Sequence, residues 1–439
     1  MGKWTWQMGA MLALVVAAGC GSAEEKPTGK EANGTADKEL NWLLSEPVVL
    51  DVYIHTGGYK REQFMAYYGD AIRAKYPNFD FRLHVPDKGS SLQELLAQGV
   101  NIDLIQSHRA NTFELMYDLK LQTDISDLIT KYKYNLNAIE PVVLEEMRQL
   151  GGGGIMGLPY ESRVNALFYN KQLFDKFGVP YPGPNQTWGD TLDLARRLSR
   201  TDGGAQYYGF LAFPRHVFLM NQLSQGYVDA SGEKAALNNT NWKQLFDMLA
   251  LFHRLPNNPF LTPGQISNTF WADGRSAMYA SMFVPDAAYI LNTQIDWDVA
   301  PYPAVQGKPG ISSGMLNYYF NLTSIGKNRE QGFLAAAFLA SEEYQLVQAG
   351  KGYNPSLQGL ARKQLGKDVP QYASRNLQAM VTDKPAGSYP VSRYQSIVDK
   401  TLDSAFNAMF EKEKDSNTAL REAEEEANRL IRQAQANGG

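Results

Sequence analysis

Residues 48–54 read Val-Val-Leu-Asp-Val-Tyr-Ile, an apolar run interrupted by a single aspartate. Such a run is typical of a strand that is covered on both faces of a sheet. From Arg61 to Tyr76 the large apolar residues recur at helical spacing, and Pro77 ends this predicted helix. Residues 79–85 alternate in polarity, which predicts a second strand. Together these segments predict a β-α-β unit and hence a parallel sheet with helices on its faces.

A third strand and two loops extend this unit. Residues 92–97 predict an amphipathic helix, and residues 102–106 predict the strand that follows it. Parallel sheets bind ligands at the carboxyl ends of their strands, where the loops leave a crevice. The loops at that edge, residues 55–60 and 107–111, supply four candidate ligand-binding residues, Gly58, Tyr59, Ser107 and His108. A tight turn that holds no ligand is an equally good interpretation of the glycine pair.

The only cysteine of the chain, Cys20, follows an N-terminal apolar run at residues 8–19. This run is too short to span a bilayer of about 30 Å as a helix, but its length is typical of a signal peptide. Ala17, Ala18 and Gly19 directly before the cysteine resemble the lipobox of bacterial lipoproteins. The resemblance implies a signal peptide at 1–19 and a lipid on Cys20. The alternative is a stray or buried cysteine in an ordinary export signal, since Ala17 stands where lipoboxes usually carry leucine.

Residues 20–45 follow the cysteine, and up to about residue 38 they offer almost nothing large and apolar to bury, so we expect a disordered tether. We therefore expect an extracytoplasmic protein that is lipid-anchored to the outer face of the bacterial cell membrane. No later segment is apolar and uncharged over the length needed to cross lipid, so the lipid is the expected membrane attachment. With one cysteine the chain can form no intramolecular disulfide.

Length, charge and residue spacing predict the number of lobes and exclude several classes of binding site. About 390 residues follow the tether, more than one hydrophobic core normally organises, which predicts two lobes. The formal net charge of −4 argues against a nucleic-acid-binding protein. The 5 histidines are dispersed without metal-ligand spacing, so we expect neither a metal site nor a cofactor. The Gly-x-Gly-x-x-Gly pattern at 152–157 precedes a predicted strand rather than a helix, which argues against dinucleotide binding.

Several longer segments stand in the order found in one known family. The segments are 95–105, 157–161, 167–174, 178–179, 187–188, 270–278, 301–303, 335–341 and 352–355. In this order and spacing they resemble family 1 extracellular solute-binding proteins, the substrate-capturing lipoproteins of bacterial ABC importers, many of which bind sugars. One departure is Ile102, which replaces a proline common before the aspartate of the first segment.

The resemblance implies an α/β, periplasmic-binding-protein-like (type II) fold with two lobes, a central cleft and closure on a bound ligand. It implies an N-terminal lobe at 46–163 plus 304–350 and a C-terminal lobe at 164–303 plus 351–439. It also implies a small-molecule solute and the transmembrane subunits of an ABC permease as partners, and no chemical reaction. We further expect a monomer and no nucleic-acid partner.

Further candidate ligand-binding residues lie where the chain crosses between the expected lobes and in the loops of the second lobe. They are Tyr160, Glu161, Arg163, Arg215, His216, Trp271, Phe283, Met315 and Tyr318. Plain structural roles compete with ligand binding at some of these positions. The alternative role of Glu161 and Arg163 is a structural ion pair. The alternative role of Trp271 is a buried core position, and that of Tyr318 is packing at a sheet edge.

These residue types suit a carbohydrate, because sugars have apolar C–H faces and hydroxyl rims. Tyrosine and tryptophan rings can cover the faces, and carboxylate, guanidinium or imidazole groups can bind the hydroxyls. We therefore expect capture of a mono- or oligosaccharide. The alternatives are a non-sugar solute on the same fold, a surface carbohydrate hydrolase, and a sensor subunit that reports ligand occupancy to a membrane kinase.

Overall fold

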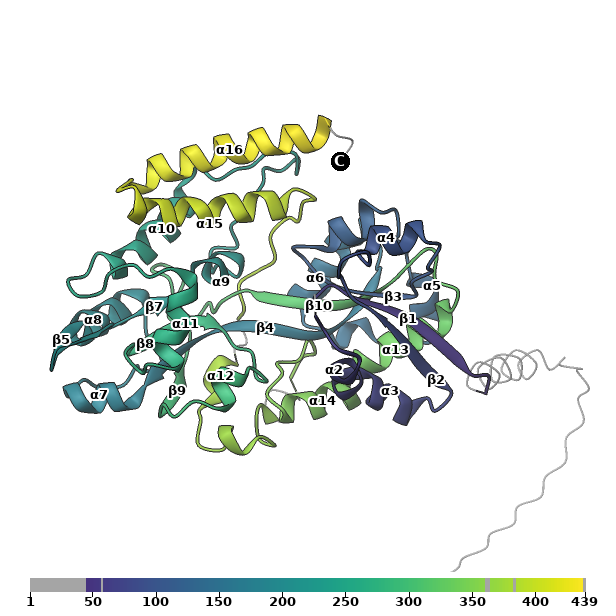
Figure 1. Ribbon diagram of the computed structural model, residues 1–439, viewed down its shortest axis with the longest axis horizontal. Helices are drawn as coiled ribbons and strands as arrows, with labels where there is room; N and C mark the ends of the chain where they lie inside the picture. The colour runs from purple at the N-terminus through teal and green to yellow at the C-terminus, as the bar shows by residue number, and fades with distance from the viewer. Residues whose placement is uncertain (1–44, 57, 360–363, 382–383, 437–439) are drawn as a thin grey trace, which may run out of the picture. The chain divides into compact units, whose positions relative to one another are not determined.

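The first predicted strand is β1 (Val48–Ile54), and it pairs in parallel with β2 (Phe79–His84) and with β3 (Leu104–His108). The computed structural model describes residues 45–56, 58–359, 364–381 and 384–436 (Figure 1). The predicted signal peptide and Cys20 lie outside the described residues, as does the predicted tether up to residue 44. The predicted β-α-β unit and its parallel strands are present.

Strand β3 begins two residues later than predicted, and Asp103 supplies the reason. Its carboxylate accepts hydrogen bonds from the backbone N–H of Asp51 at 3.0 Å and of Asn328 at 2.9 Å. The Asp103 side chain therefore accepts the hydrogen bond from the Asp51 N–H that a strand partner would otherwise accept, and regular pairing of β1 with β3 begins at Leu104.

The predicted helix at 61–76 is a continuous helical run with a wider turn inside it. It consists of α2 (Arg61–Phe64), a π-helical turn (Met65–Gly69) and α3 (Asp70–Lys75). Gly69 lets the Met65 side chain pack against the backbone of this turn, because a Cβ there would lie 2.4 Å from the sulfur of Met65 and would displace it. Inserting one extra residue into a helical turn re-aims the neighbouring side chains, and here those of Tyr67 and Tyr68 line a pocket.

The longest strand, β4 (Gly157–Asn170), belongs to two parts of the sheet. Its first half pairs antiparallel with β10 (Met315–Leu322), with Glu161 opposite Tyr318. Its second half pairs with β8 (Met278–Met282) on one side and with β9 (Trp297–Ala300) on the other. The sheet order is β2-β1-β3-β10-β4-β8-β7, with β9 beside β4. One strand therefore runs through both lobes, as predicted for the crossing (Figure 1).

The other elements of the first lobe are helices on the faces of this sheet. They are α4 (Leu92–Ala97), a π-helical turn (Phe113–Tyr117), α5 (Ser126–Lys131), a 3₁₀ turn (Leu136–Ala138), α6 (Pro141–Leu150), α13 (Arg329–Leu339) and α14 (Glu342–Gly350). Helix α4 has the predicted bounds, because Ser91 and Glu94 cap its N-terminus reciprocally.

The second lobe surrounds the other end of β4. It contains α7 (Lys171–Phe177), α8 (Trp188–Leu198), β5 (Arg200–Asp202), β6 (Ala205–Tyr207), β7 (Leu211–Ala212), α9 (Pro214–Leu219), α10 (Thr240–His253), α11 (Pro263–Trp271) and α12 (Ala288–Leu291). Gly178 closes α7 at a φ of 63°, and Thr187 caps α8, as predicted. The prediction that Arg215 and His216 lie in a loop of the second lobe is wrong, because both belong to α9, whose first turn contains Pro214.

The C-terminal part adds two 3₁₀ turns (Pro370–Tyr372 and Leu377–Met380) and two long helices, α15 (Gln395–Glu411) and α16 (Ser416–Ala436). Helix α16 lies along α15 and buries a narrow stripe of Leu420, Ala423, Ala427 and Ile431. The predicted lobe boundaries stay predictions, because residues 47–439 form one compact unit.

His253 ends α10 inside the core of the second lobe. Its ring lies against Phe260 and Phe410, at centroid distances of 5.2 and 5.3 Å. Neither ring nitrogen has a hydrogen-bond partner among the described residues, and burial lowers the pKa of His253 to about 4. The folded protein therefore holds this imidazole neutral.

We predict that His253 makes the protein acid-sensitive. An unfolded histidine titrates near pH 6.5, so between about pH 6.5 and pH 4 the unfolded chain binds a proton that the folded chain does not. The free energy of unfolding should therefore fall as the pH drops through this range, by up to about 1.4 kcal/mol per pH unit for this residue. Urea denaturation at several pH values should show a flatter profile for His253→Leu.

The matched control is Phe410→Leu, which alters the same cluster but removes no titrating group. Its profile should lie below that of the wild type and parallel to it. If His253→Leu also runs parallel to the wild type, the unpartnered histidine does not contribute to acid sensitivity.

Candidate functional site

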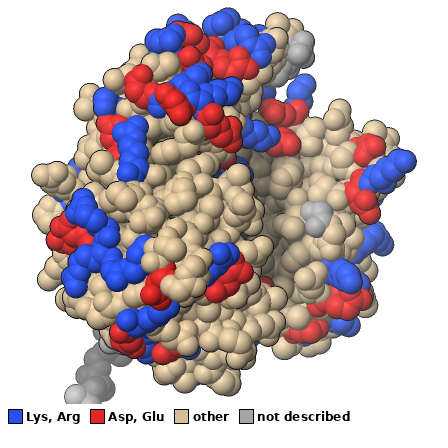
Figure 2. Space-filling model, turned by 60° about the vertical axis from the view of Figure 1, so that its left-hand side comes forward, with Lys and Arg blue, Asp and Glu red and all other residues tan. Residues whose placement is uncertain are grey.

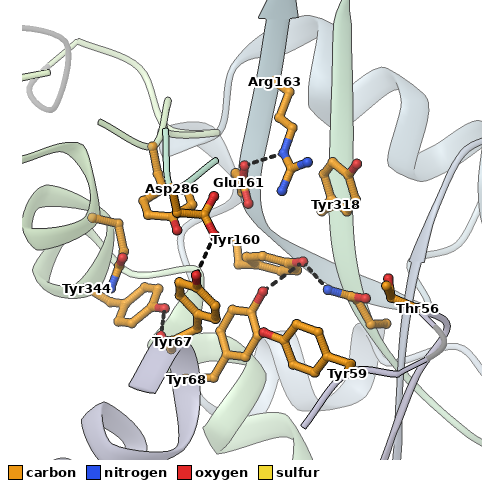
Figure 3. A pocket seen from close by; sticks show the side chains of 13 residues that line it. Thr56, Tyr59, Tyr67, Tyr68, Tyr160, Glu161, Arg163, Asp286, Tyr318 and Tyr344 are labelled. Carbon is orange, nitrogen blue, oxygen red and sulfur yellow. Dashed lines mark hydrogen bonds and ion pairs between the residues drawn. The ribbon is translucent and has the colours of Figure 1, made fainter. Parts of the chain in front are cut away.

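A pocket of about 140 Å³ lies where the carboxyl ends of β1 and β3 approach the middle of β4. The side chains that line it are Thr56, Tyr59, Tyr67, Tyr68, Gln106, Tyr160, Glu161, Arg163, Asp286, Tyr318, Tyr344, Gln348 and Tyr353 (Figure 3). Asp286 comes from the loop after β8 in the second lobe, whereas most of the others belong to the first lobe. The surface is hollowed between the two lobes (Figure 2). The pocket therefore collects side chains from both lobes.

The fold explains why these side chains meet. Thr56 and Tyr59 lie in the loop that leaves the carboxyl end of β1, and Gln106 lies on β3. Tyr160, Glu161 and Arg163 lie on β4 close to the point where the strand changes partners. The predicted ligand-binding edge of the parallel strands is thus one wall of the pocket.

Tyrosine dominates the lining of the pocket. The rings of Tyr68 and Tyr160 lie edge to face at a centroid distance of 5.3 Å, and Tyr67 lies 6.2 Å from Tyr353. The hydroxyl of Tyr160 accepts hydrogen bonds from Gln106 Nε2 at 2.6 Å and from the Tyr68 hydroxyl at 3.4 Å. Burial raises the pKa of Tyr68 and Tyr160 and, with the hydrogen bond to Asp286, raises the pKa of Tyr67 to about 12. These hydroxyls therefore stay protonated at neutral pH.

Three charged side chains lie among the tyrosines. Glu161 Oε1 and Arg163 Nε form an ion pair at 2.6 Å, and the side chain of Glu161 is only 5% exposed. The Arg163 guanidinium lies 4.6 Å from the centre of the Tyr318 ring. Burial opposes its charge, but the neighbouring Glu161 carboxylate raises the pKa of Arg163. The third group is Asp286, whose carboxylate accepts a hydrogen bond from the Tyr67 hydroxyl (Figure 3).

The structure brings five of the predicted site residues together in this pocket, namely Tyr59, Tyr160, Glu161, Arg163 and Tyr318. Gly58 precedes Tyr59 in a turn and has a φ of 71°, which glycine adopts readily. Met315 is buried at the start of β10 and does not line the pocket.

The other predicted residues are occupied by structural contacts. Ser107 Oγ is hydrogen-bonded to Thr112 at 2.8 Å and to Asn321 at 2.7 Å. His108 accepts a hydrogen bond from the Ala110 N–H at 3.2 Å, and burial lowers its pKa to about 3. Neither side chain lines the pocket, although the His108 ring lies 5.5 Å from the centre of the Tyr318 ring.

In the second lobe Arg215 pairs with the buried Asp399 at 2.8 Å, and His216 Nδ1 lies 3.0 Å from Ser281 Oγ. Burial lowers the pKa of His216 to about 3. Trp271 and Phe283 pack against Phe168 inside an aromatic cluster. Trp271 thus has the buried position that was one of its two predicted roles.

Eight lining residues were not predicted as site residues: Thr56, Tyr67, Tyr68, Gln106, Asp286, Tyr344, Gln348 and Tyr353. Thr56 lies in the predicted loop 55–60 and Gln106 ends the predicted strand 102–106, so the predicted ligand-binding edge of the sheet could have identified both residues. Tyr67 and Tyr68 belong to the apolar residues that recur at helical spacing in the predicted helix at 61–76, and this spacing does not distinguish pocket positions from core positions. Asp286 lies in the loop after β8, and no local sequence pattern marks it.

The fold and the pocket define a two-lobed α/β binding protein whose ligand site lies between the lobes. Residues 57–346, about two thirds of the chain, match the family model of bacterial extracellular solute-binding proteins. The chain belongs to this family, whose members act outside the cytoplasm.

Three known proteins illustrate the similarity. An ABC transporter extracellular-binding protein of Pyrococcus horikoshii is 26% identical over 201 residues, which is 44% of this chain and 42% of that protein. An ABC substrate-binding protein from Listeria monocytogenes, solved in complex with cycloalternan, has a TM-score of 0.67 at 16% identity and covers 88% of this chain and 99% of its own. The maltose/maltodextrin-binding domain MalE from Bdellovibrio bacteriovorus, bound to maltotriose, has a TM-score of 0.64 at 17% identity, covering 88% and 100%. The two solved structures share the predicted two-lobe fold.

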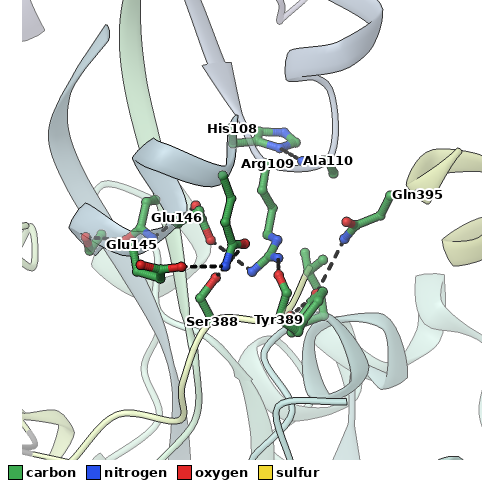
Figure 4. A network of polar contacts seen from close by, with 12 residues as sticks. His108, Arg109, Ala110, Glu145, Glu146, Ser388, Tyr389 and Gln395 are labelled. Carbon is green, nitrogen blue, oxygen red and sulfur yellow. Dashed lines mark hydrogen bonds and ion pairs between the residues drawn. The ribbon is translucent and has the colours of Figure 1, made fainter. Parts of the chain in front are cut away.

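A second polar network lies beside the cleft and ties the C-terminal segment to the first lobe (Figure 4). Arg109, in the loop after β3, donates to Glu146 at 2.9 Å and to the carbonyl of Tyr389 at 2.7 Å, and its guanidinium lies 3.7 Å from the centre of the Tyr389 ring. Glu146 also accepts hydrogen bonds from Asn317 and Tyr319. Arg109 and Glu146 are almost completely buried.

We predict that Arg109→Met lowers the free energy of unfolding by about 3–5 kcal/mol, because it leaves the Glu146 carboxylate buried without its cation. Arg196→Met is the matched control, since Arg196 and Asp193 form an ion pair that is mostly exposed. That control should cost less than about 1 kcal/mol. Urea denaturation measures both variants, and equal midpoints would contradict a structural role for the buried pair.

Proposed function

We propose that this protein captures a carbohydrate in the tyrosine-lined pocket and delivers it to the permease of an ABC importer. The observation that carries the proposal is the combination of seven tyrosines with Glu161, Arg163, Gln106 and Asp286 in one pocket between two lobes. The tyrosine rings offer apolar faces, and the polar groups offer donors and acceptors around them. The sugars bound to the two solved relatives support this choice of ligand.

The chemistry of a sugar fits these groups one by one. A C–H face stacked on a tyrosine removes roughly 40 Å² of apolar surface from water, worth about 1 kcal/mol per ring. Glu161 and Asp286 can accept hydrogen bonds from hydroxyl groups, whereas Arg163 and Gln106 can donate them. A volume of about 140 Å³ is below the roughly 300–1,000 Å³ of most ligand sites, so the pocket suits one sugar ring. A longer saccharide would extend along the cleft.

The proposed mechanism is closure of the two lobes around the sugar. Tyr67 of the first lobe already contacts Asp286 of the second, so a ligand beside this pair would touch both lobes. Shifting an equilibrium from 1:99 to 99:1 needs about 10⁴-fold tighter binding to the closed form, or roughly 5.5 kcal/mol. We propose that only the closed form presents both lobes to the permease, and that the protein works as a monomer without altering its ligand.

A thermal-shift screen against a sugar library tests ligand capture. A sugar present at about 100 times its dissociation constant should raise the free energy of unfolding by about 2.7 kcal/mol. Tyr160→Ala should abolish most of this gain, whereas Tyr181→Ala should keep it, because Tyr181 is 42% exposed and lies outside the pocket. With the active sugar bound, small-angle scattering should show a smaller radius of gyration. Stabilisation by non-sugar solutes alone would overturn the carbohydrate proposal.

We also propose that a lipid on Cys20 anchors the protein to the outer face of the cell membrane. Among the described residues no helix is long and apolar enough to cross a membrane. The proposal rests on the N-terminal apolar run and the small residues before the cysteine.

We predict that Cys20→Ser moves the protein from the membrane fraction to the soluble fraction, because the residue that would carry the lipid is lost. Membrane fractionation and intact-mass measurement of the purified protein check this outcome. Ser22→Ala, two residues further on, is the control and should leave the protein in the membrane fraction. A wild-type mass without a lipid increment would overturn the anchor.

A further inference from the structure

The charges of the pocket do not balance. Its lining holds two carboxylates, Glu161 and Asp286, and one guanidinium, Arg163. Arg163 pairs with Glu161 through Nε at 2.6 Å, so these two charges offset each other. Asp286 has no such cation: its Oδ2 accepts from the neutral Tyr67 hydroxyl, and Oδ1 accepts no hydrogen bond from any described residue. The lining therefore carries a net charge of about −1 at neutral pH, centred on Asp286.

Three tyrosines lie on the Asp286 side of the pocket. Tyr67 contacts Asp286 directly and lies 6.4 Å from Tyr59 and 6.2 Å from Tyr353, measured between ring centres. After burial, the negative charge of Asp286 is one of the causes that raise the pKa of Tyr59 and Tyr353. Tyrosine faces within about 6 Å attract a cation, and an adjacent carboxylate adds to that attraction.

The same arrangement repels anions. A phosphate ester brings a charge of about −1.5 to −2 near neutral pH. The one guanidinium of the lining pairs with Glu161 through Nε, so Glu161 offsets its charge although its terminal nitrogens donate to no described residue. A phosphate would therefore enter a lining whose net charge is already negative, with the exposed Asp286 carboxylate beside it.

We propose that the pocket selects amino sugars, whose protonated amine lies between Asp286 and the faces of Tyr59, Tyr67 and Tyr353, and that it rejects sugar phosphates. This inference rests on the proposed carbohydrate function and specifies the charge of the sugar. The ring hydroxyls would bind the Glu161–Arg163 pair and Gln106 on the opposite wall.

The test uses matched probes built on glucose, galactose and mannose: the neutral sugar, its 2-amino-2-deoxy form, the N-acetylated amine and the 6-phosphate. Isothermal titration at pH 7 gives each affinity. For at least one skeleton the amino form should bind about tenfold more tightly than the neutral and N-acetyl forms, equivalent to about 1.4 kcal/mol. The N-acetyl form controls for size, because it is larger than the amine but uncharged. The 6-phosphate should not bind measurably.

The Asp286→Asn variant tests the contribution of the Asp286 negative charge. It keeps the size of the side chain and should reduce the amino-to-neutral affinity ratio about tenfold. Asp193→Asn is the matched control, because Asp193 is exposed and outside the pocket, and it should leave the ratio unchanged. Circular dichroism confirms that both variants fold.

The outcomes separate this inference from the function on which it rests. Equal or tighter binding of the neutral or phosphorylated forms would overturn the selection for amines and leave carbohydrate capture intact. Binding of spermidine but of no sugar would overturn carbohydrate capture while supporting a cation site at Asp286. Binding of none of the probes would overturn the amino-sugar assignment, and the wider sugar library then decides the function. An unchanged ratio in Asp286→Asn would remove Asp286 from the explanation.

Discussion

The antiparallel ladder between β4 and its three partner strands is the constraint on which the rest of the structure depends. The first half of β4 is held by β10 and its second half by β8 and β9, so this strand joins the sheet of one lobe to that of the other. The pairing with β10 shifts register between Tyr318 and Tyr319, opposite Glu161 and Pro159. Tyr160 lies at this irregularity, and with Glu161 and Arg163 it lines the pocket.

Two local devices bring the other walls of the pocket to these residues. The π-helical turn at Met65–Gly69 carries Tyr67 and Tyr68, and both side chains line the pocket. On the other side, the loop after β8 presents Asp286. The buried contacts of Arg109 with Glu146 and Tyr389 hold the C-terminal segment beside the cleft. Backbone geometry, not the ligand chemistry itself, thus decides which side chains meet.

Much of the fold could be predicted from the sequence, because periodicity, proline and cap residues act locally. Strand β1, helix α4 and the glycine cap of α7 appear at their predicted positions. The site was harder to predict. The residues on β4 could be found from the crossing, but Tyr67 and Tyr68 look like core positions until the extra residue in their turn is known. Conversely, Ser107, His108 and His216 look like ligand donors, and only the folded structure shows that Ser107 Oγ and one ring nitrogen of each histidine contact neighbouring protein groups.

A strand shared by both lobes also restricts how they can move. Sliding one lobe past the other would break ladder hydrogen bonds along β4, whereas bending or twisting the strand keeps them, so relative motion is a rotation about an axis near its middle. Displacement then grows with distance from that axis. In the proposed closure Glu161 and Arg163, which lie on β4, would move little and keep their ion pair, whereas Asp286 and Tyr67, which belong to different lobes, would separate on opening. The contact between Asp286 and Tyr67 would then mark the end of the closing swing.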